Sequence, residues 1–210
     1  MKYFTTTAFI LLFMVFTVSA FSNSNAKIYK GSVTLENGQV LEGQIQMLSP
    51  TLNEIKVKFI DNNGKSTTYK AKEVATYSFI FPKYNAETKS YDNSVIEYVK
   101  KEVKVAPIPF GPKEVLVERQ VSGVINLYNF YVETRASSQA FTHNFLVEKN
   151  GETIVLDSKN YRNILKDMVA DHPELKAKVG KKGYNYKYIA NVISEYNNYA
   201  TPEGMHLGIK

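Results

Sequence analysis

The sequence predicts an α+β protein in which an antiparallel sheet comes first along the chain and two or three helices follow it. Through most of the chain, apolar residues alternate with polar ones over short segments that tight turns separate, which is the pattern of strands. After about residue 160 the apolar period changes to that of a helix. The 15 Tyr and 12 Phe supply a large apolar core. Strands first and helices last is the order typical of α+β proteins.

The N-terminus has the pattern of a secretory signal peptide. Lys2 precedes an apolar run from Ala8 to Val18, and small-residue sites end at Ala20 and Ala26. An export channel and its peptidase read such a pattern. We expect cleavage after Ala20 or Ala26 and an exported protein that is periplasmic, secreted or associated with the cell envelope. The alternative is an uncleaved anchor, because the charge-free residues 3–21 approach the roughly 20 residues that span a bilayer.

Composition narrows the kinds of chemistry that are open to the chain. It has no cysteine, which excludes disulfides, thiolate metal sites, a cysteine nucleophile and a lipid-modified N-terminal cysteine. Small exported domains often depend on disulfides, so here the apolar core must suffice. The formal net charge of +6 favours an anionic glycan or lipid surface over nucleic acid as a partner outside the cytoplasm. Plain solubility is the alternative explanation of the charge.

Residues 27–105 are predicted to form a small β-barrel or sandwich-like unit. Asn37-Gly38 predicts a hairpin with a type I′ turn, in which both central residues have positive φ. Residues 61–64 predict a second turn, and Pro82 is expected to end the strand before it. The predicted strands of this unit are 28–35, 40–45, 54–60, 65–70, 74–81 and 94–105.

Residues 106–112 hold three prolines and a glycine, which disfavour both helix and sheet. We interpret them as a joint between two sheet units, with a rigid crossover inside one domain as the alternative. A second series of strands then follows, with a type I′ hairpin at Asn150-Gly151. Residues 127–132 are apolar on both faces, which predicts a central strand covered on both sides. We expect the cover to come from the C-terminal helices. The predicted strands are 115–121, 124–133, 140–148 and 153–156.

Three helices are predicted to complete residues 113–200. The first has one apolar stripe and a cap at Asp157 or Ser158. The second begins with a capping box formed by Asp171 and Glu174 and ends at Gly180 in the left-handed conformation. The third covers residues 186–198, and residues 201–210 are a loose tail. The apolar positions of the first and third helices are Tyr161, Ile164, Leu165, Met168 and Val169, then Ile189, Val192, Ile193 and Tyr196.

No motif in the sequence predicts a catalytic residue, a cofactor or a metal. The histidines at 143, 172 and 206 are far apart and form no H-x-x-x-H pair. His143 is in phase with an apolar strand face, so we expect a hydrogen-bonded sheet histidine. The turn at 61–64 places glycine at the wrong position for a calcium loop. There is no G-x-S-x-G elbow, Walker loop or G-x-G-x-x-G fingerprint.

One segment is a candidate for contact with a polyanion or a partner. Lysines that bind phosphate or carboxylate are interleaved there with tyrosines that stack on sugars or bases. The alternative is a solvated loop between helices whose tyrosines anchor it to the sheet. The candidate residues are Lys176, Lys178, Lys181, Lys182, Tyr184, Tyr186 and Lys187.

Several strings resemble a group of signal-peptide-bearing exported proteins of Gram-negative bacteria that have no assigned function. They are Tyr29-Lys30-Gly31, Asn37-Gly38, Leu41 to Ile45, Val115 to Tyr131 and Ile193 to Asn197. The resemblance implies a bacterial envelope origin and transfers no catalytic residue.

The sequence therefore predicts a non-enzymatic exported envelope protein that binds a partner protein or an anionic glycan or lipid surface. One alternative is an envelope hydrolase whose acidic pair is assembled by long-range folding. Another is a structural accessory of an envelope complex. A binding module is expected to present an exposed aromatic or basic patch without a deep pocket, whereas a hydrolase requires two carboxylates that converge in a cleft.

Overall fold

The computed structural model describes residues 27–103, 113–133 and 141–201. The predicted signal peptide (1–26) and proline-rich joint (106–112) lie outside the described residues, as does almost all of the predicted tail. The strands on either side of the joint, which end at Val103 and begin at Lys113, pair directly with each other.

The described strands form one ten-stranded antiparallel sheet in the order β10-β9-β8-β7-β6-β5-β1-β2-β3-β4. Neighbours along the chain are neighbours in the sheet except at β5, which follows β4 but pairs with β1. The predicted antiparallel sheet is confirmed, and closure of the N-terminal strands into a barrel stays a prediction. The strands are β1 (Ile28–Leu35), β2 (Val40–Gln46), β3 (Lys56–Ile60), β4 (Ser66–Lys70), β5 (Val74–Asn85), β6 (Ser90–Val103), β7 (Lys113–Val121), β8 (Ile125–Glu133), β9 (Phe141–Lys149) and β10 (Glu152–Leu156).

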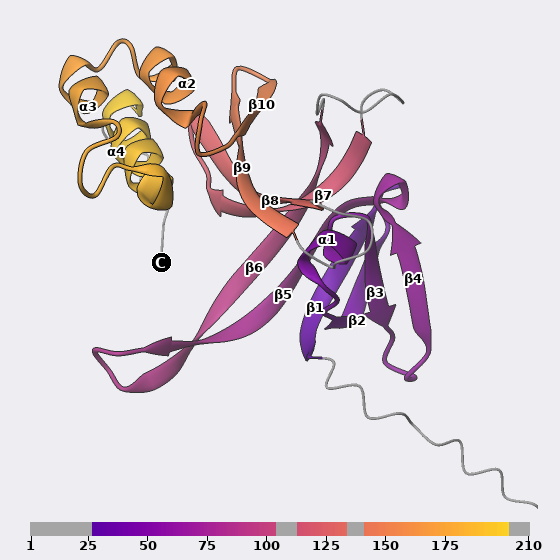
Figure 1. Ribbon diagram of the computed structural model, residues 1–210. Coiled ribbons are helices and arrows are strands. Elements are labelled where there is room, and N and C mark those ends of the chain that lie inside the picture. Colours follow the sequence, from indigo (N-terminus) through magenta and orange to yellow (C-terminus); the bar gives the residue numbers. More distant parts are fainter. Residues whose placement is uncertain (1–26, 104–112, 134–140, 202–210) are drawn as a thin grey trace, which may run out of the picture.

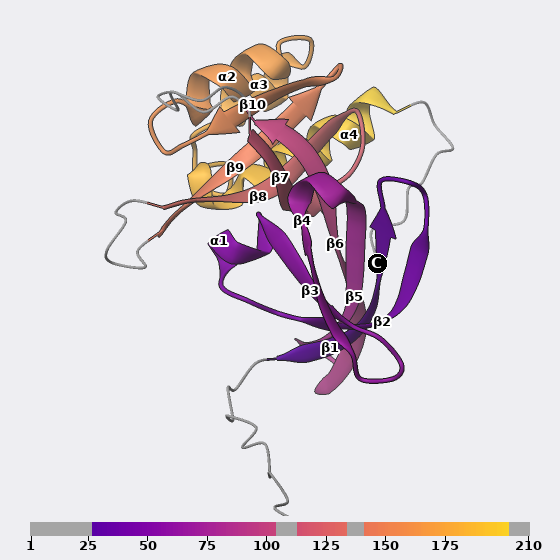
Figure 2. The same ribbon diagram turned by 90° about the vertical axis from the view of Figure 1, so that its right-hand side faces the viewer.

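Of the four α-helices in the described residues, three follow the sheet, as predicted. They are α2 (Tyr161–Met168), α3 (Pro173–Lys178) and α4 (Ile189–Ala200), whereas α1 (Pro50–Asn53) is a single turn between β2 and β3. Figures 1 and 2 show α2, α3 and α4 gathered beside the β7–β10 end of the sheet, away from β1–β4. The apolar stripes of α2 and α4 are buried against β8 and β9, which confirms the predicted inward faces.

The hairpin turns confirm most of the turn predictions. Asn150 and Gly151 have φ values of 54° and 80°, as a type I′ turn requires. The type I′ prediction for the first hairpin is wrong, because there only Gly38 has a positive φ. The Gly38 amide donates to the Leu35 carbonyl at 2.9 Å. The loop has three residues, 36–38, because the Leu35 amide donates to the Gln39 carbonyl. A type I turn followed by one left-handed glycine forms such a loop, so a single glycine suffices.

The helix caps differ from the prediction. The N-cap of α3 is His172 rather than Asp171, and it makes no capping hydrogen bond through its side chain. The following Pro173 occupies the first turn, where its fixed φ is already helical. The Asp171 carboxylate instead accepts a hydrogen bond from the Tyr196 hydroxyl on α4 at 3.0 Å. Gly180 has a φ of 91°, which confirms the predicted left-handed residue.

The N-cap of α2 is Asn160 rather than Asp157 or Ser158, and it makes no side-chain capping bond. The Asp157 carboxylate accepts hydrogen bonds from the amides of Lys159 and Asn160. These two hydrogen bonds hold the turn that leads into the helix. Asp157 lies three residues before the N-cap.

The central strand β8 is covered on both faces, as predicted, but the C-terminal helices cover only one of them. Ile125 and Leu127 face the helices, whereas Tyr128 and Phe130 face a second apolar cluster on the opposite side. The face of β8 that carries Tyr128 and Phe130 is covered in part because the sheet coils. This coiling brings β10 into contact with β6, although three strands lie between them. A third cluster fills the space among β1–β6.

The N-terminal strands are joined to the middle of the sheet through Glu54, which follows α1. Its backbone carbonyl accepts a hydrogen bond from the Leu116 amide of β7 at 2.8 Å. Its carboxyl oxygen Oε1 accepts one from the Tyr131 amide of β8 at 2.5 Å. Glu54 itself is 4% exposed, so a single acidic residue is buried where three parts of the chain meet.

The strands β5 and β6 extend beyond the sheet as a two-stranded arm, residues 80–97. The last pair between β1 and β5 is Gly31 with Phe79, and the pairing of β6 with β7 starts at Tyr98. Figure 1 shows the arm projecting from the body at the lower left. The prediction that Pro82 ends a strand is wrong, because Pro82 lies within β5 and pairs with Asn93. A proline is tolerated there since β5 has a neighbour on only one side.

Candidate functional site

The arm carries an exposed apolar surface, which we call the arm face. Cross-strand pairing places Ile80 opposite Val95, and Tyr84 opposite Tyr91, on the same side of the two strands. Val95 and Tyr91 are both 71% exposed, and the Tyr84 and Tyr91 rings meet edge to face at 5.4 Å. The arm face consists of Ile80, Pro82, Tyr84, Tyr91, Asn93 and Val95, none of which is charged.

The opposite side of the arm has the reverse character. Near the body, Phe79 and Phe81 pack against the ring of Tyr29 at centroid distances of 5.3 and 5.4 Å. Toward the tip, the charged residues Lys83 and Asp92 are opposite each other. Apart from Glu97 at its base, which pairs with Arg119, the arm therefore has its charged strand residues on one side and uncharged aromatic and aliphatic side chains on the other. This exposure makes the arm face a candidate interaction site.

Sequence reasoning missed the arm because it stopped the strand at Pro82 and began the next at residue 94. A usable signal was present. Residues 80, 82 and 84 and residues 91, 93 and 95 have the period of two of a strand on both sides of a polar turn.

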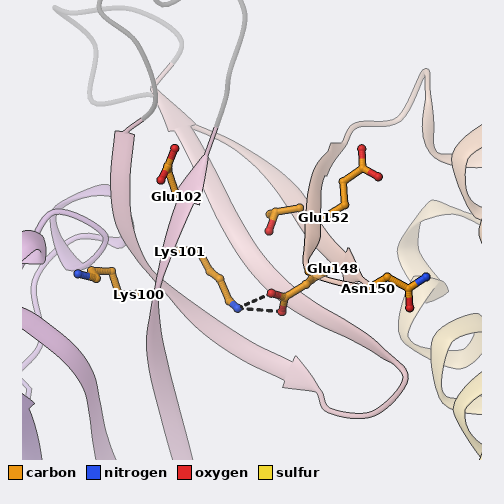
Figure 3. Close-up of a pocket in the computed structure, with 8 residues that line it drawn as sticks. Lys100, Lys101, Glu102, Glu148, Asn150 and Glu152 are labelled. Atoms are coloured by element: carbon orange, nitrogen blue, oxygen red, sulfur yellow. Dashed lines mark hydrogen bonds and ion pairs between the residues drawn. The ribbon is translucent and has the colours of Figure 1, made fainter. Parts of the chain in front are cut away.

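A second candidate is a polar cavity of about 650 Å³ between β6 and the β9–β10 hairpin (Figure 3). The Lys101 ammonium reaches into it from β6 and donates to both carboxylate oxygens of Glu148 on β9, at 2.7 and 2.8 Å. The cavity is lined by Lys100, Lys101, Glu102, Glu148, Asn150, Gly151, Glu152 and Thr153.

The Glu148 carboxylate is held by several donors at once. The Tyr128 hydroxyl donates to it at 2.7 Å and the Asn126 amide at 3.2 Å, in addition to Lys101. Burial raises the pKa of the Glu148 carboxyl, but the hydrogen bonds from Lys101, Tyr128 and Asn126 outweigh it and lower the pKa overall. Glu148 therefore stays ionised at neutral pH and forms an ion pair with Lys101.

Three acidic residues, Glu102, Glu148 and Glu152, line the cavity, and the hydrolase alternative requires two carboxylates that converge. Glycoside cleavage also needs one carboxyl that holds a proton at neutral pH. Glu148 does not meet that condition, because its pKa is lowered. Among the described residues, no group of three or more His, Asp or Glu side chains is placed to hold a metal ion.

In the structure, only some residues of the predicted lysine–tyrosine segment are exposed. Lys181, Lys182 and Lys187 are exposed, whereas Lys178 forms an ion pair with Glu195 of α4 at 2.6 Å. The Tyr184 hydroxyl donates to the same carboxylate at 2.7 Å, and Lys176 is half-buried. Three of the five lysines thus remain available for a polyanion, and that contact stays a prediction.

Tyr186 anchors this segment to the sheet, as the alternative interpretation requires. Its ring packs edge to face on Phe145 of β9 and on Tyr161 of α2, both at 5.4 Å. Its hydroxyl donates to the carbonyls of His143 and Leu156. Tyr186, one of the tyrosines that the sequence offered for stacking on a ligand, is therefore engaged within the protein.

The described histidines have structural partners. The His143 ring nitrogen Nε2 is 2.9 Å from the Asn129 amide oxygen, and its ring stacks on Tyr131 at 5.0 Å. This confirms the predicted hydrogen-bonded sheet histidine. The His172 ring packs on Tyr199 at 4.2 Å, and His206 lies outside the described residues.

No helix in the described part of the chain is long and apolar enough to cross a membrane. Comparison of the chain with protein-family models, with curated proteins and with solved structures finds no match.

Proposed function

We propose that this is a non-enzymatic exported binding protein of the bacterial envelope, and that it holds a partner protein through the arm face. The observation that carries the proposal is the exposure of Ile80, Tyr84, Tyr91 and Val95 on a projecting hairpin. Exposed tyrosines and aliphatic side chains are typical of the energetic centre of a protein–protein contact. Export rests on the signal-peptide pattern of the first 26 residues.

The chemistry of the arm face favours a protein over an anionic surface. An acidic glycan or lipid headgroup is held by Lys and Arg, and the arm face has neither. The body supports the arm through the cluster among β1–β6, where Tyr29 and Phe79 stack. This separate cluster also supports the proposal that the N-terminal strands act as a small barrel-like unit.

A photo-crosslinking amino acid at Val95 is expected to trap one envelope protein as an adduct of defined mass. The same group at Lys83, on the opposite side of the arm, is expected to trap none. Changing Tyr84 and Tyr91 to serine should lower the Val95 adduct about tenfold or more, because central aromatic contacts carry much of the binding energy. The yield is measured by immunoblot and the partner is identified by mass spectrometry.

The matched control for the tyrosine pair is Lys83→Ser with Asp92→Ser, a cross-strand pair on the other side of the same arm. It should leave the Val95 adduct unchanged. Adducts of equal yield at both positions would contradict the proposal. So would adducts with lipid alone, or retention of the arm on uncharged phosphatidylcholine vesicles that the tyrosine changes abolish, since these point to a membrane.

A second function, contact with an anionic glycan or lipid surface, is favoured by the exposure of Lys181, Lys182 and Lys187 in one segment. Lys181→Ala with Lys182→Ala is then expected to lower the salt concentration at which the protein elutes from heparin. Each phosphate- or sulfate-type contact adds to the salt dependence of such binding.

The control is Lys65→Ala with Lys72→Ala, which removes two other exposed lysines and makes the same change in net charge. If both double variants elute at the same lowered salt concentration, only the overall charge matters. In that case Lys181 and Lys182 do not form a site.

A further inference from the structure

The arm has two edges, and they differ. Within the described chain, residues 80–85 of β5 and residues 90–97 of β6 pair only with each other. The outer edge of β5 contains Pro82, which has no amide to donate, followed by Lys83. Both features protect an edge strand from pairing with another chain. The outer edge of β6 has no proline from residue 90 to 103.

We propose that the outer edge of β6 in the arm pairs with the same edge of a second copy of this chain. The two β6 strands would be antiparallel about a two-fold axis at Asn93, and the two arms would form one four-stranded sheet. Paired two-fold interfaces of this kind are the commonest in homo-oligomers. The inference goes beyond the proposed partner binding and does not depend on it, because the pairing is made by the open backbone groups of β6. Side chains of the arm face set only its register.

The sequence of the edge is complementary to itself in this register. A two-fold axis at Asn93 places Tyr91 opposite Val95 of the second copy, which joins two exposed apolar side chains on the same face. It brings Lys89, the turn residue before β6, near Glu97, which would then lie between Lys89 of the second copy and its present partner Arg119. Opposite charges across a strand pair are favourable.

Neighbouring registers lack this match. An axis at Asp92 places two aspartates opposite each other, which is unfavourable. An axis at Ser94 places Tyr91 opposite Glu97, whose carboxylate already forms an ion pair with Arg119 at 2.9 Å. Of these three registers, the one centred at Asn93 joins apolar side chains to apolar ones and brings a positive side chain to a negative one.

Pairing in this register would also stabilise the arm, which has only two strands. A hairpin of two strands has little stability by itself in water, whereas a sheet of three or more strands with an apolar face is stable. The proposed sheet would pair the open amides and carbonyls of β6 and double the arm face, which remains free for another protein.

The absence of cysteine permits a direct test of the register. In Asn93→Cys the two sulfur-bearing residues would be directly opposite, with Cβ atoms about 4.5–5.5 Å apart, close to the separation that a disulfide bridges. Mild oxidation of the purified protein should give a disulfide-linked dimer about tenfold faster than oxidation of Lys83→Cys, where the cysteines meet only by collision. A mixture of Tyr91→Cys and Val95→Cys should form mostly the mixed dimer.

Sedimentation velocity tests pairing without a cross-link. The unaltered protein is expected to dimerise, and Asn93→Lys should raise the dissociation constant about tenfold or more by placing like charges at the axis. Glu87→Lys, in the turn of the arm, should leave it unchanged. Dimers that form equally well with Asn93→Lys would overturn the proposal, as would Asn93→Cys that oxidises no faster than Lys83→Cys.

The two proposals fail separately. A protein that stays monomeric but still cross-links an envelope protein from Val95 would remove the dimer and leave the proposed function standing. A dimer with no adduct from Val95 other than its own second copy would do the reverse.

Discussion

Replacing Glu54 with glutamine is expected to stabilise the protein at alkaline pH and to have little effect at acidic pH. Burial raises the pKa of the Glu54 carboxyl to about 8, although the hydrogen bond from the Tyr131 amide and the charge of Lys113 act in the opposite direction. The folded protein therefore holds a neutral carboxyl where most proteins have a carboxylate. Glutamine keeps the carbonyl oxygen that accepts from Tyr131 and carries no charge to bury.

The sign of the effect follows from proton binding. In the unfolded chain Glu54 loses its proton near its ordinary pKa of 4.5, whereas in the folded protein it keeps the proton until about pH 8. Between these values the folded state binds more protons, so its stability falls by about 1.4 kcal/mol for each pH unit. Across the whole window the loss from this group is about 5 kcal/mol, an order-of-magnitude figure, and Glu54→Gln removes it.

Urea unfolding at pH 5 and pH 9 measures the effect. The difference in unfolding free energy between the variant and the unaltered protein should grow by several kcal/mol from the lower to the higher pH. Glu42 is exposed on β2, and Glu42→Gln makes the same change in charge. Its difference in unfolding free energy should not grow with pH. A difference for Glu54→Gln that does not change with pH would show that the buried carboxyl is ionised throughout.

Replacing Asn197 with alanine is expected to destabilise the protein by about 2–4 kcal/mol, because it leaves two buried backbone groups unpaired. Asn197 lies on α4 and is 7% exposed. Its side-chain oxygen accepts from the amide of Ile125, and its side-chain nitrogen donates to the carbonyl of the same residue, both at 2.8 Å. The side-chain amide of Asn197 thus makes the two hydrogen bonds to Ile125 that a neighbouring strand would make at the start of β8.

The adjacent Asn198 is exposed on the same helix, so Asn198→Ala is the matched control. It removes the same side chain without unpairing Ile125 and should change the unfolding free energy by less than about 0.5 kcal/mol. Both variants are compared by urea unfolding at one pH. Equal effects would show that the helix is held on the sheet by its apolar stripe alone.

Much of the secondary structure was predictable because it depends on residues that are close in the sequence. The stripe of α4, from Ile189 to Tyr196, follows from the helical period, and all four of its predicted apolar positions are buried. The Asn150-Gly151 turn follows from the ease with which those two residues adopt a positive φ. The strands between Val115 and Leu156 follow from alternation and match the prediction closely.

The candidate sites were less predictable because they are assembled by distant segments. Nothing near Glu54 in the sequence distinguishes it from the other 19 acidic residues. Its backbone and side-chain partners are Leu116 and Tyr131, which lie just beyond the pair Glu118–Asn129 where the pairing of β7 with β8 ends. The pair of Lys101 with Glu148 likewise joins residues 47 positions apart. The lysine–tyrosine segment looked like one site, yet folding turned Tyr186 inward.

The sequence by itself determined the α+β class, most strand and helix positions and the left-handed glycines, since periodicity and backbone preference act over a few neighbouring residues. Only the tertiary structure decided that all described strands share one sheet, that β5 and β6 run past their neighbours as an arm, and that a carboxyl is buried at Glu54. These features depend on which distant strands pair and where the pairing stops. That choice is made by the sum of long-range contacts and is not visible in any single segment.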